Sequence, residues 1–171
     1  SLFDTCESLT SLDITHLKTS NVRDMSGMFR GCKILTSLNL NNFDASSATD
    51  LSQMFADMLK LETLDLSSFN PIEAENMNKM FYQCRALKSI NLSKFTSNNV
   101  RNLLGMFQSC NALIELDLKD FITSEVVTME AMFSDANTLA SLDLSSFTGE
   151  NLGTMKNMFL CCKKLTSINL P

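Results

Sequence analysis

Hydrophobic side chains recur along the chain at a fixed interval of 26 residues. All the phenylalanines fall into two series with this spacing, and a methionine stands directly before most members of the first series. An internal period this regular predicts a chain built from stacked copies of one small unit. The first series is Phe3, Phe29, Phe55, Phe81, Phe107, Phe133 and Phe159, and the second is Phe43, Phe69, Phe95, Phe121 and Phe147.

Each period contains two apolar segments with different spacing. In residues 61–69 hydrophobic and polar side chains alternate, so Leu64 and Leu66 share one face while Asp65 lies on the other. This alternation predicts a strand that is buried on one side. In residues 22–32 apolar side chains follow one another at steps of three and four, which is typical of one face of a short helix. We expect the methionines of this face to lie in the core rather than in a binding groove.

Neither segment can bury its apolar side alone, so neighbouring periods must cover one another. Parallel pairing of the strands would place a sheet on the concave face, and the wider helices would line the convex face. The sequence therefore predicts an α/β fold: a right-handed solenoid of leucine-rich-repeat type. About 6.5 repeats of 26 residues would form a single domain over residues 1–171.

Composition narrows the functions that such an array can have. The net charge of −5 offers a nucleic acid no attraction, and no apolar run approaches the roughly 18 residues of a membrane span. One histidine and no tryptophan leave few groups for catalysis, which needs an acid, a base or a nucleophile that converge in a pocket. We expect no enzyme activity, no cofactor or metal, no nucleic-acid partner and no direct membrane insertion.

Five cysteines share one position of the repeat, three residues after the first phenylalanine series. Met58 and Ala136 replace cysteine in this column, which indicates a small, buried, apolar position. Equivalent positions on neighbouring helices would lie about 8–10 Å apart, whereas a disulfide needs Cα atoms within about 7 Å. We therefore expect reduced core thiols rather than disulfides or a zinc site, and an exposed Cys161 beside the column. The column is Cys6, Cys32, Cys84, Cys110 and Cys162.

The outward side chains of the predicted strands form polar columns on the concave face. In the central column aspartate and asparagine mostly alternate, which lowers like-charge repulsion and lets amides donate hydrogen bonds to carboxylates. Three interpretations stay open: a solvated sheet face, a shallow surface for a glycan or an extended polypeptide, and a cation held by Asp117 and Asp143. The candidate binding residues are Asp13, Asn39, Asp65, Asn91, Glu115, Asp117, Lys119 and Asp143.

Two stretches of the repeat carry a resemblance to a known family. The sequence Leu-Asp-Leu-Ser-Ser-Phe at 64–69 and again at 142–147, together with residues 19–32, resembles the BspA-like leucine-rich repeats. More closely, it is similar to the 26-residue repeat of bacterial surface proteins that is also found in mycoplasma lipoproteins. The resemblance covers the whole chain and implies a secreted or cell-surface protein that takes part in attachment. It names no ligand.

These observations favour a noncatalytic repeat module that binds an extracellular protein or glycan in adhesion to host or neighbouring cells. The alternatives are a structural spacer that holds another domain off the cell surface and an intracellular protein-interaction scaffold, which the free cysteines favour. Neither end shows a polar capping turn, so we expect a fragment of a longer array, with its signal or anchor elsewhere. Uncapped ends also make end-to-end self-association an expected interaction.

Overall fold

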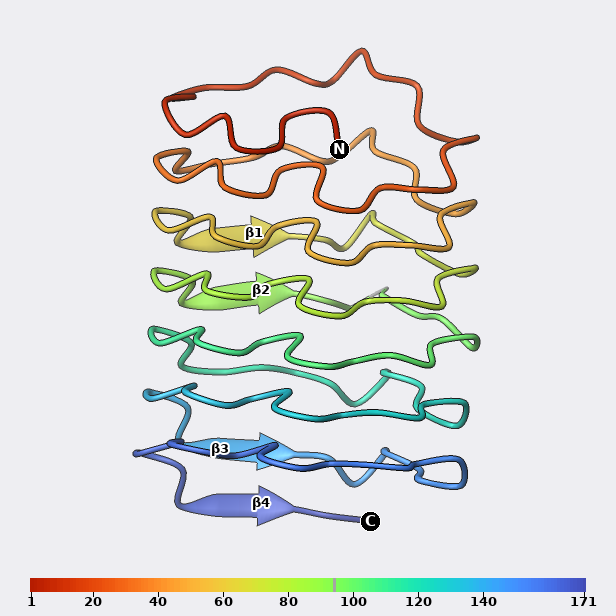
Figure 1. Ribbon diagram of the computed structural model, residues 1–171, viewed down its shortest axis with the longest axis vertical. Helices are drawn as coiled ribbons and strands as arrows, with labels where there is room; N and C mark the ends of the chain where they lie inside the picture. Colours follow the sequence, from red (N-terminus) through yellow and green to blue (C-terminus); the bar gives the residue numbers. More distant parts are fainter. Residues whose placement is uncertain (94) are drawn as a thin grey trace.

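The computed structural model describes residues 1–93 and 95–171 of the chain. Successive 26-residue periods form coils that lie one above another along a single axis, with the two termini at opposite ends of the stack (Figure 1). The described strands, in chain order, are β1 (Thr63–Asp65), β2 (Ser89–Asn91), β3 (Ser141–Asp143) and β4 (Ser167–Asn169). The repeat of the sequence is therefore also a repeat of the backbone.

The expected α/β class is wrong, because no helix occurs in the described residues and none lines the convex face. The described residues do not form a single continuous sheet either. Strand β1 pairs with β2 and strand β3 pairs with β4, both in parallel, as two separate two-stranded sheets. Each pairing joins residues one period apart, such as Leu64 with Ile90 and Leu142 with Ile168.

The segment that was expected to be helical is a run of tight turns that bonds to its neighbours. The Met28 N–H donates to the Met25 carbonyl and the Cys32 N–H to the Phe29 carbonyl, both at 3.2 Å. Between them, the Phe29 N–H donates to the Met54 carbonyl of the next coil at 2.9 Å. A helix would direct every such N–H to a carbonyl four residues back in its own segment. Steps of three and four thus marked the buried side chains correctly but not the backbone.

Left-handed backbone conformations explain how this segment turns so tightly. Two columns of the repeat have φ between 53° and 70°, a region that costs a residue with a Cβ atom about 1–2 kcal/mol. Glycine occupies only three of these positions, and at Gly31 an added Cβ would also lie 3.2 Å from the Thr5 Cα atom. The columns are Gly27, Gln53, Lys79, Gly105, Ala131 and Asn157, and Thr5, Gly31, Asp57, Gln83, Ser109, Asp135 and Cys161.

A second ladder of backbone contacts runs where each turn segment begins. Isolated parallel bridges join Asp24 to Asp50, Asp50 to Asn76, and so on through Asn102 and Thr128 to Thr154, always one period apart. Backbone contacts therefore join neighbouring coils on the turn side as well as on the strand side. Each coil depends on its neighbours for backbone hydrogen bonds as much as for burial of its apolar side chains.

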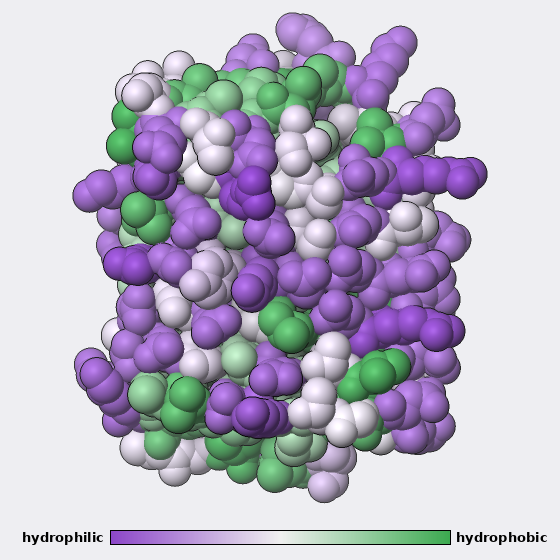
Figure 2. Space-filling model, in the orientation of Figure 1, coloured by the Kyte–Doolittle hydropathy of each residue, from purple (hydrophilic) through white to green (hydrophobic). Residues whose placement is uncertain are grey.

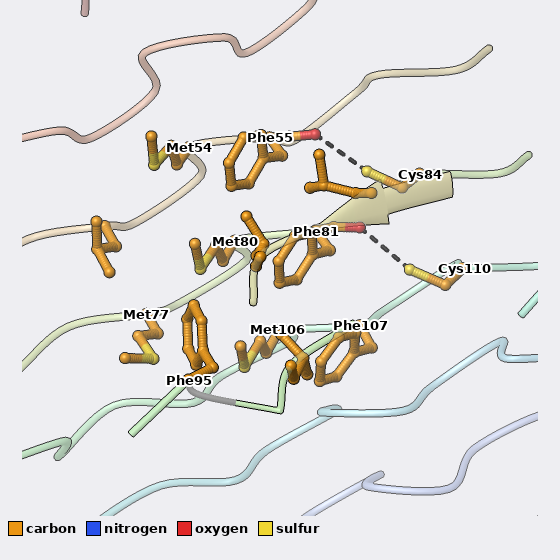
Figure 3. Close-up of a cluster of buried hydrophobic side chains, with 14 of the residues drawn as sticks. Met54, Phe55, Met77, Met80, Phe81, Cys84, Phe95, Met106, Phe107 and Cys110 are labelled. Carbon is orange, nitrogen blue, oxygen red and sulfur yellow. Dashed lines mark hydrogen bonds between the residues drawn. The ribbon is translucent and has the colours of Figure 1, made fainter. Parts of the chain in front are cut away.

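The core consists of side-chain columns that follow the stack axis. Neighbouring rings of the first phenylalanine series lie 5.3–5.8 Å apart with interplanar angles of 10° or less. The second series is stacked at 5.9–6.2 Å. Figure 3 shows Phe55, Phe81 and Phe107 one over another, with their preceding methionines in a parallel column. The methionines of this column are buried from Met28 to Met158, so their prediction as core residues is confirmed.

Among the described residues, three ion pairs join charged side chains of adjacent coils at the same repeat position. The Arg30 guanidinium makes two contacts with the Asp4 carboxylate, at 2.6 and 2.8 Å, and Lys33 pairs with Glu7 at 2.7 Å. The third pair joins Lys88 and Glu62 at 2.7 Å.

Within the described residues, the chain contains no helix long and apolar enough to cross a membrane.

The substitution Ala131→Gly should raise the free energy of unfolding by about 1 kcal/mol, because Ala131 has a φ of 54° that glycine adopts without steric conflict. The matched control is Ala112→Gly, at another half-buried alanine that is not in the left-handed columns. This control should lower the free energy of unfolding by about 0.5–1 kcal/mol. Urea denaturation of both variants measures the difference, and a destabilised Ala131→Gly variant would contradict the strain argument.

Candidate functional site

The central polar column predicted from the strand pattern lies on one exposed face of the stack, which we call the strand face. All seven of its side chains are exposed, from Asp13 in the first coil to Asn169 in the last. The candidate residues Glu115 and Lys119, which flank Asp117, are also exposed on this face. The structure therefore brings the predicted residues onto one surface, spread over successive coils, rather than into a single enclosed pocket.

The column has a structural role that the sequence analysis did not assign. In each of the first six coils, the Oδ1 atom of the aspartate or asparagine accepts a hydrogen bond from the backbone N–H two residues later. The donors and distances are Thr15 to Asp13 at 3.0 Å, Asn41 to Asn39 at 3.0 Å, Ser67 to Asp65 at 2.9 Å, Ser93 to Asn91 at 3.1 Å, Lys119 to Asp117 at 3.1 Å and Ser145 to Asp143 at 2.9 Å. This is the Asx turn, which bends the chain away at the end of each strand segment.

These hydrogen bonds also hold the aspartates of the column in their charged form. Bonds from Ser67 keep the pKa of Asp65 below its usual value, and bonds from Ser145 do the same for Asp143. The side-chain amide of Asn169 donates to Asp143 Oδ1 at 3.1 Å, so the predicted bonding between amide and carboxylate along the column exists at this step. The carboxylates are thus stable anions on an open face.

Asp117 and Asp143 are the two carboxylates of the column that stand in consecutive coils. Hydrogen bonds from Lys119 lower the pKa of Asp117, whereas the nearby negative charge of Asp143 opposes that lowering. The Lys119 ammonium also pairs with Asp117 Oδ2 at 3.1 Å. No group of three or more His, Cys, Asp or Glu side chains in the described residues is placed to hold a metal ion.

The strand face is hollowed beside these two carboxylates. An open depression of about 400 Å³ is bordered by Glu115, Asp117 and Asp143, and Ile90 and Ile114 contribute apolar surface. Ile114 is 60% exposed. Most residues at the equivalent position of the other periods are polar, so an exposed isoleucine is unusual in this column. Residues 115–117 form no strand and lie between β2 and β3, so the sheet is interrupted at this coil. The depression therefore lies at the coil that carries Glu115 and Asp117 together.

A second polar column, on the turn side, was missed. Its side-chain oxygens accept hydrogen bonds from the N–H two residues later, as with Ser26 to Asp24 and Ser52 to Asp50, both at 2.8 Å. The Asn76 amide also donates to Asp50 Oδ2 at 3.2 Å. The signal was present in the sequence, because every period holds Asp, Asn or Thr at this position. The column is Asp24, Asp50, Asn76, Asn102, Thr128 and Thr154.

The cysteine column lies in the core as expected, apart from its end coils. Cys32, Cys84 and Cys110 are buried and free, whereas Cys6 is exposed in the first coil. The Cys84 thiol donates to the Phe55 carbonyl at 3.0 Å and the Cys110 thiol to the Phe81 carbonyl at 3.2 Å (Figure 3). Each buried thiol therefore has a backbone acceptor in the preceding coil.

The distance argument against disulfides was wrong, because it assumed helices about 8–10 Å apart. Coils joined by parallel backbone hydrogen bonds lie about 4.8 Å apart, which is within the Cα range of a disulfide. All six cysteines are free in the structure. Cys161 is exposed, as predicted.

Comparison with known proteins now adds the family. A model of the family described as "Mycoplasma protein of unknown function, DUF285" matches residues 1–114 and 87–169. The chain belongs to this family. The two matches to DUF285 overlap over residues 87–114, close to one period, as expected when a model can align to a repeat in more than one register. Comparisons with curated proteins and with solved structures gave no match.

Acid should destabilise this DUF285 chain through its Asx turns. The pKa values of Asp13, Asp65, Asp117 and Asp143 lie below the usual 3.8 in the folded state, so the unfolded chain binds protons first as the pH falls. Their stabilising contribution is complete above about pH 5 and is lost as the pH falls through the lower folded values.

Replacing these four aspartates with asparagine keeps an Oδ1 acceptor that does not titrate, as in the native Asn39 and Asn91 turns. The variant should therefore lose less of its melting temperature than the wild type between pH 5 and about pH 3. Thermal melts at several pH values measure this. Equal acid sensitivity of the two proteins would show that other carboxyl groups dominate.

The exposed cysteines should react with thiol reagents faster than the buried ones. Burial raises the pKa of Cys32 to about 11 and that of Cys84 to about 12, so neither forms a thiolate at neutral pH. Ellman's reagent should react rapidly with Cys6 and Cys161 in the folded protein and with all six cysteines in denaturant. The variant Cys161→Ser should remove one rapid equivalent, whereas Cys84→Ser should remove none.

Proposed function

We propose that the chain is a noncatalytic binding module of a bacterial cell-surface protein, which holds an extracellular protein or glycan on its strand face during adhesion. The resemblance of residues 19–32 and 64–69 to BspA-like repeats supports the surface location and the role in attachment. The exposed row of carboxylate, amide and hydroxyl groups on the strand face supports recognition of a polar, extended ligand.

The depression beside Asp117 is the observation that carries this proposal. Asx turns account for the aspartates and asparagines of the other coils without any ligand, but they do not account for the exposed Ile114 or for Glu115. A depression that combines apolar side chains with charged residues is a common composition for a recognition site. The ligand would lie across the coils over this depression, with Glu115 and Asp143 at its border.

The shape of the site predicts weak binding by one module. The depression is open, and its border in the described structure contains no Trp, Tyr or Arg, the residues that dominate tight interfaces. Useful attachment would then come from many copies that act together at a surface.

The second candidate function is a spacer that holds another domain away from the cell. The observation in its favour is that the central column is already occupied by its own backbone hydrogen bonds. A spacer needs the stack and its ladders but not the depression, so the two functions predict different effects of a substitution at its rim.

The variant Glu115→Lys tests the proposal, because this side chain is exposed and its substitution leaves the Asx turns in place. Binding to a panel of immobilised matrix proteins and mucin glycans should fall about tenfold or more for each probe that the wild type binds, since the rim charge is reversed. Multivalent display of the chain on beads makes weak binding measurable.

The matched control is Glu73→Lys, an equal charge change at an exposed residue outside the strand face. It should bind like the wild type, and all three proteins should melt at the same temperature. If Glu115→Lys and Glu73→Lys bind alike, the depression is not the site. If the wild type binds no probe while cells that display the chain adhere normally with either variant, the spacer function is favoured.

A further inference from the structure

The depression beside Asp117 is linked to a second one. A small hollow adjoins it, bordered by Asp117, Asp120 and Ser93. Asp120 and Ser93 also border the second depression, which has a volume of about 620 Å³ and includes Ser67 and Thr96 in its lining. A ligand that occupies the depression beside Asp117 therefore has a path over Asp120 into the second depression.

Backbone groups beside the first depression lack partners. One period earlier, β2 (Ser89–Asn91) pairs with β1 along its whole length. Residues 115–117 occupy the equivalent position, yet none of their backbone N–H or C=O groups takes part in a hydrogen bond with another described residue. The backbone groups of a folded protein are normally paired with protein or with water. An extended polypeptide brings both N–H and C=O groups to such a surface and can pair with them.

An exposed apolar side chain of this size is uncommon along the stack. On the face that Figure 2 shows, hydrophilic residues predominate between the two ends and hydrophobic ones form small separate patches. Ile114 is 60% exposed, whereas the other exposed large hydrophobic side chains in residues 16–154 of the described structure are exposed by 46% or less.

Side chains that face the core elsewhere are also partly uncovered at this coil. Leu64 and Leu142 are each only 3% exposed, whereas Ile90 and Leu116, at the same repeat position, are half-buried and line the depression. With Ile114 they give the depression an apolar surface, which favours a ligand that brings an aliphatic or aromatic side chain.

Carboxylates dominate the charge around both depressions. The acidic residues on their borders are Glu115, Asp117, Asp120 and Asp143, and no lysine or arginine borders either depression in the described structure. Lys119 lies beside them, but its ammonium already pairs with Asp117 at 3.1 Å. Complementary charge across an interface steers the partner and disfavours partners of the same sign. The surface therefore favours a positively charged ligand.

We propose that this surface binds an extended basic segment of a partner protein, in which lysine or arginine stands next to an apolar side chain. The inference rests on the proposed function and narrows its ligand to one chemical class. The apolar side chain packs on Ile114, the positive side chains pair with Glu115 and Asp120, and the backbone of the segment bonds to residues 115–117. A glycan supplies hydroxyl groups for such bonds, but a neutral or acidic glycan has no positive charge for the carboxylates.

Three labelled eight-residue peptides test the ligand class, with the chain displayed on beads. The first alternates lysine and valine, the second replaces each lysine with glutamate, and the third replaces each valine with serine. The first should bind at least about tenfold more tightly than either of the others, because only it combines positive charge with apolar side chains. Its binding should weaken as salt is added. Equal binding of the first peptide and either of the other two would overturn the proposal.

A triple variant locates the binding. Ile114→Thr, Glu115→Ser and Asp117→Asn together give residues 114–117 the sequence of residues 36–39. The Asx turn stays, since Asn39 makes the same turn in its own coil. The variant should melt close to the temperature of the wild type and bind the lysine–valine peptide about tenfold or more weakly. Unchanged affinity would show that the peptide binds elsewhere, which contradicts the proposal.

The matched control removes two carboxylates elsewhere, through Glu73→Gln and Glu150→Gln, at exposed residues that line neither depression. It lowers the negative charge as much as the triple variant does and should bind the peptide like the wild type. If the control loses as much affinity as the triple variant, the peptide responds to the net charge and not to this surface, and the proposal is wrong.

The panel of matrix proteins and mucin glycans separates this inference from the proposed function. If panel members bind and depend on Glu115 while the lysine–valine peptide does not bind, the ligand class is wrong and the proposed function stands. The same conclusion follows if only glycans bind. If the peptide binds and the triple variant loses that binding, the inference holds. If neither the peptide nor any panel member binds, both fail.

Discussion

The fold depends on one arrangement of backbone hydrogen bonds: alternate N–H groups of the turn segment donate to the next coil rather than to their own. Phe29 to Met54 and Phe55 to Met80 are two steps of this ladder, both at 2.9 Å. Because every step joins residues about one period apart, each side chain lies over its equivalent in the next coil. The stacked phenylalanines, the thiol-to-carbonyl bonds and the ion pairs between coils all follow from this register.

The polar columns follow from the same register. Each coil must turn within a few residues at the end of its strand segment. A short side chain stabilises that turn when its oxygen accepts a hydrogen bond from the backbone N–H two residues later. Asp65 and Asn91 serve equally well, which explains why both types occupy the column although their charges differ. The aspartates and asparagines that the sequence suggested as binding residues therefore stabilise the turn of each coil in the first place.

The sequence was sufficient to predict which side chains are buried and which share a face. The period and the alternation alone predicted that Phe81 and Cys84 are buried and that Asp117 is exposed. Burial follows the repeat for a helix and for a run of turns alike. The helix was mispredicted because steps of three and four fit a helix and a run of tight turns alike. Gly27, Gly31 and Gly105 were the local sign of left-handed backbone. The depression beside Asp117 lies where the sheet is interrupted between β2 and β3, and neither the period nor the alternation of the sequence predicts that interruption.

The ladder also gives the protein a particular response to mechanical load. Force applied along the axis would pull on the contacts between coils one after another, so the weakest junction would yield while the others remained closed. Each coil that peels away releases about 26 residues, or roughly 90 Å of extended chain at about 3.4 Å per residue. Tension between two anchored ends would thus be dissipated in discrete steps, and the coils that remain stacked would keep the contacts between them.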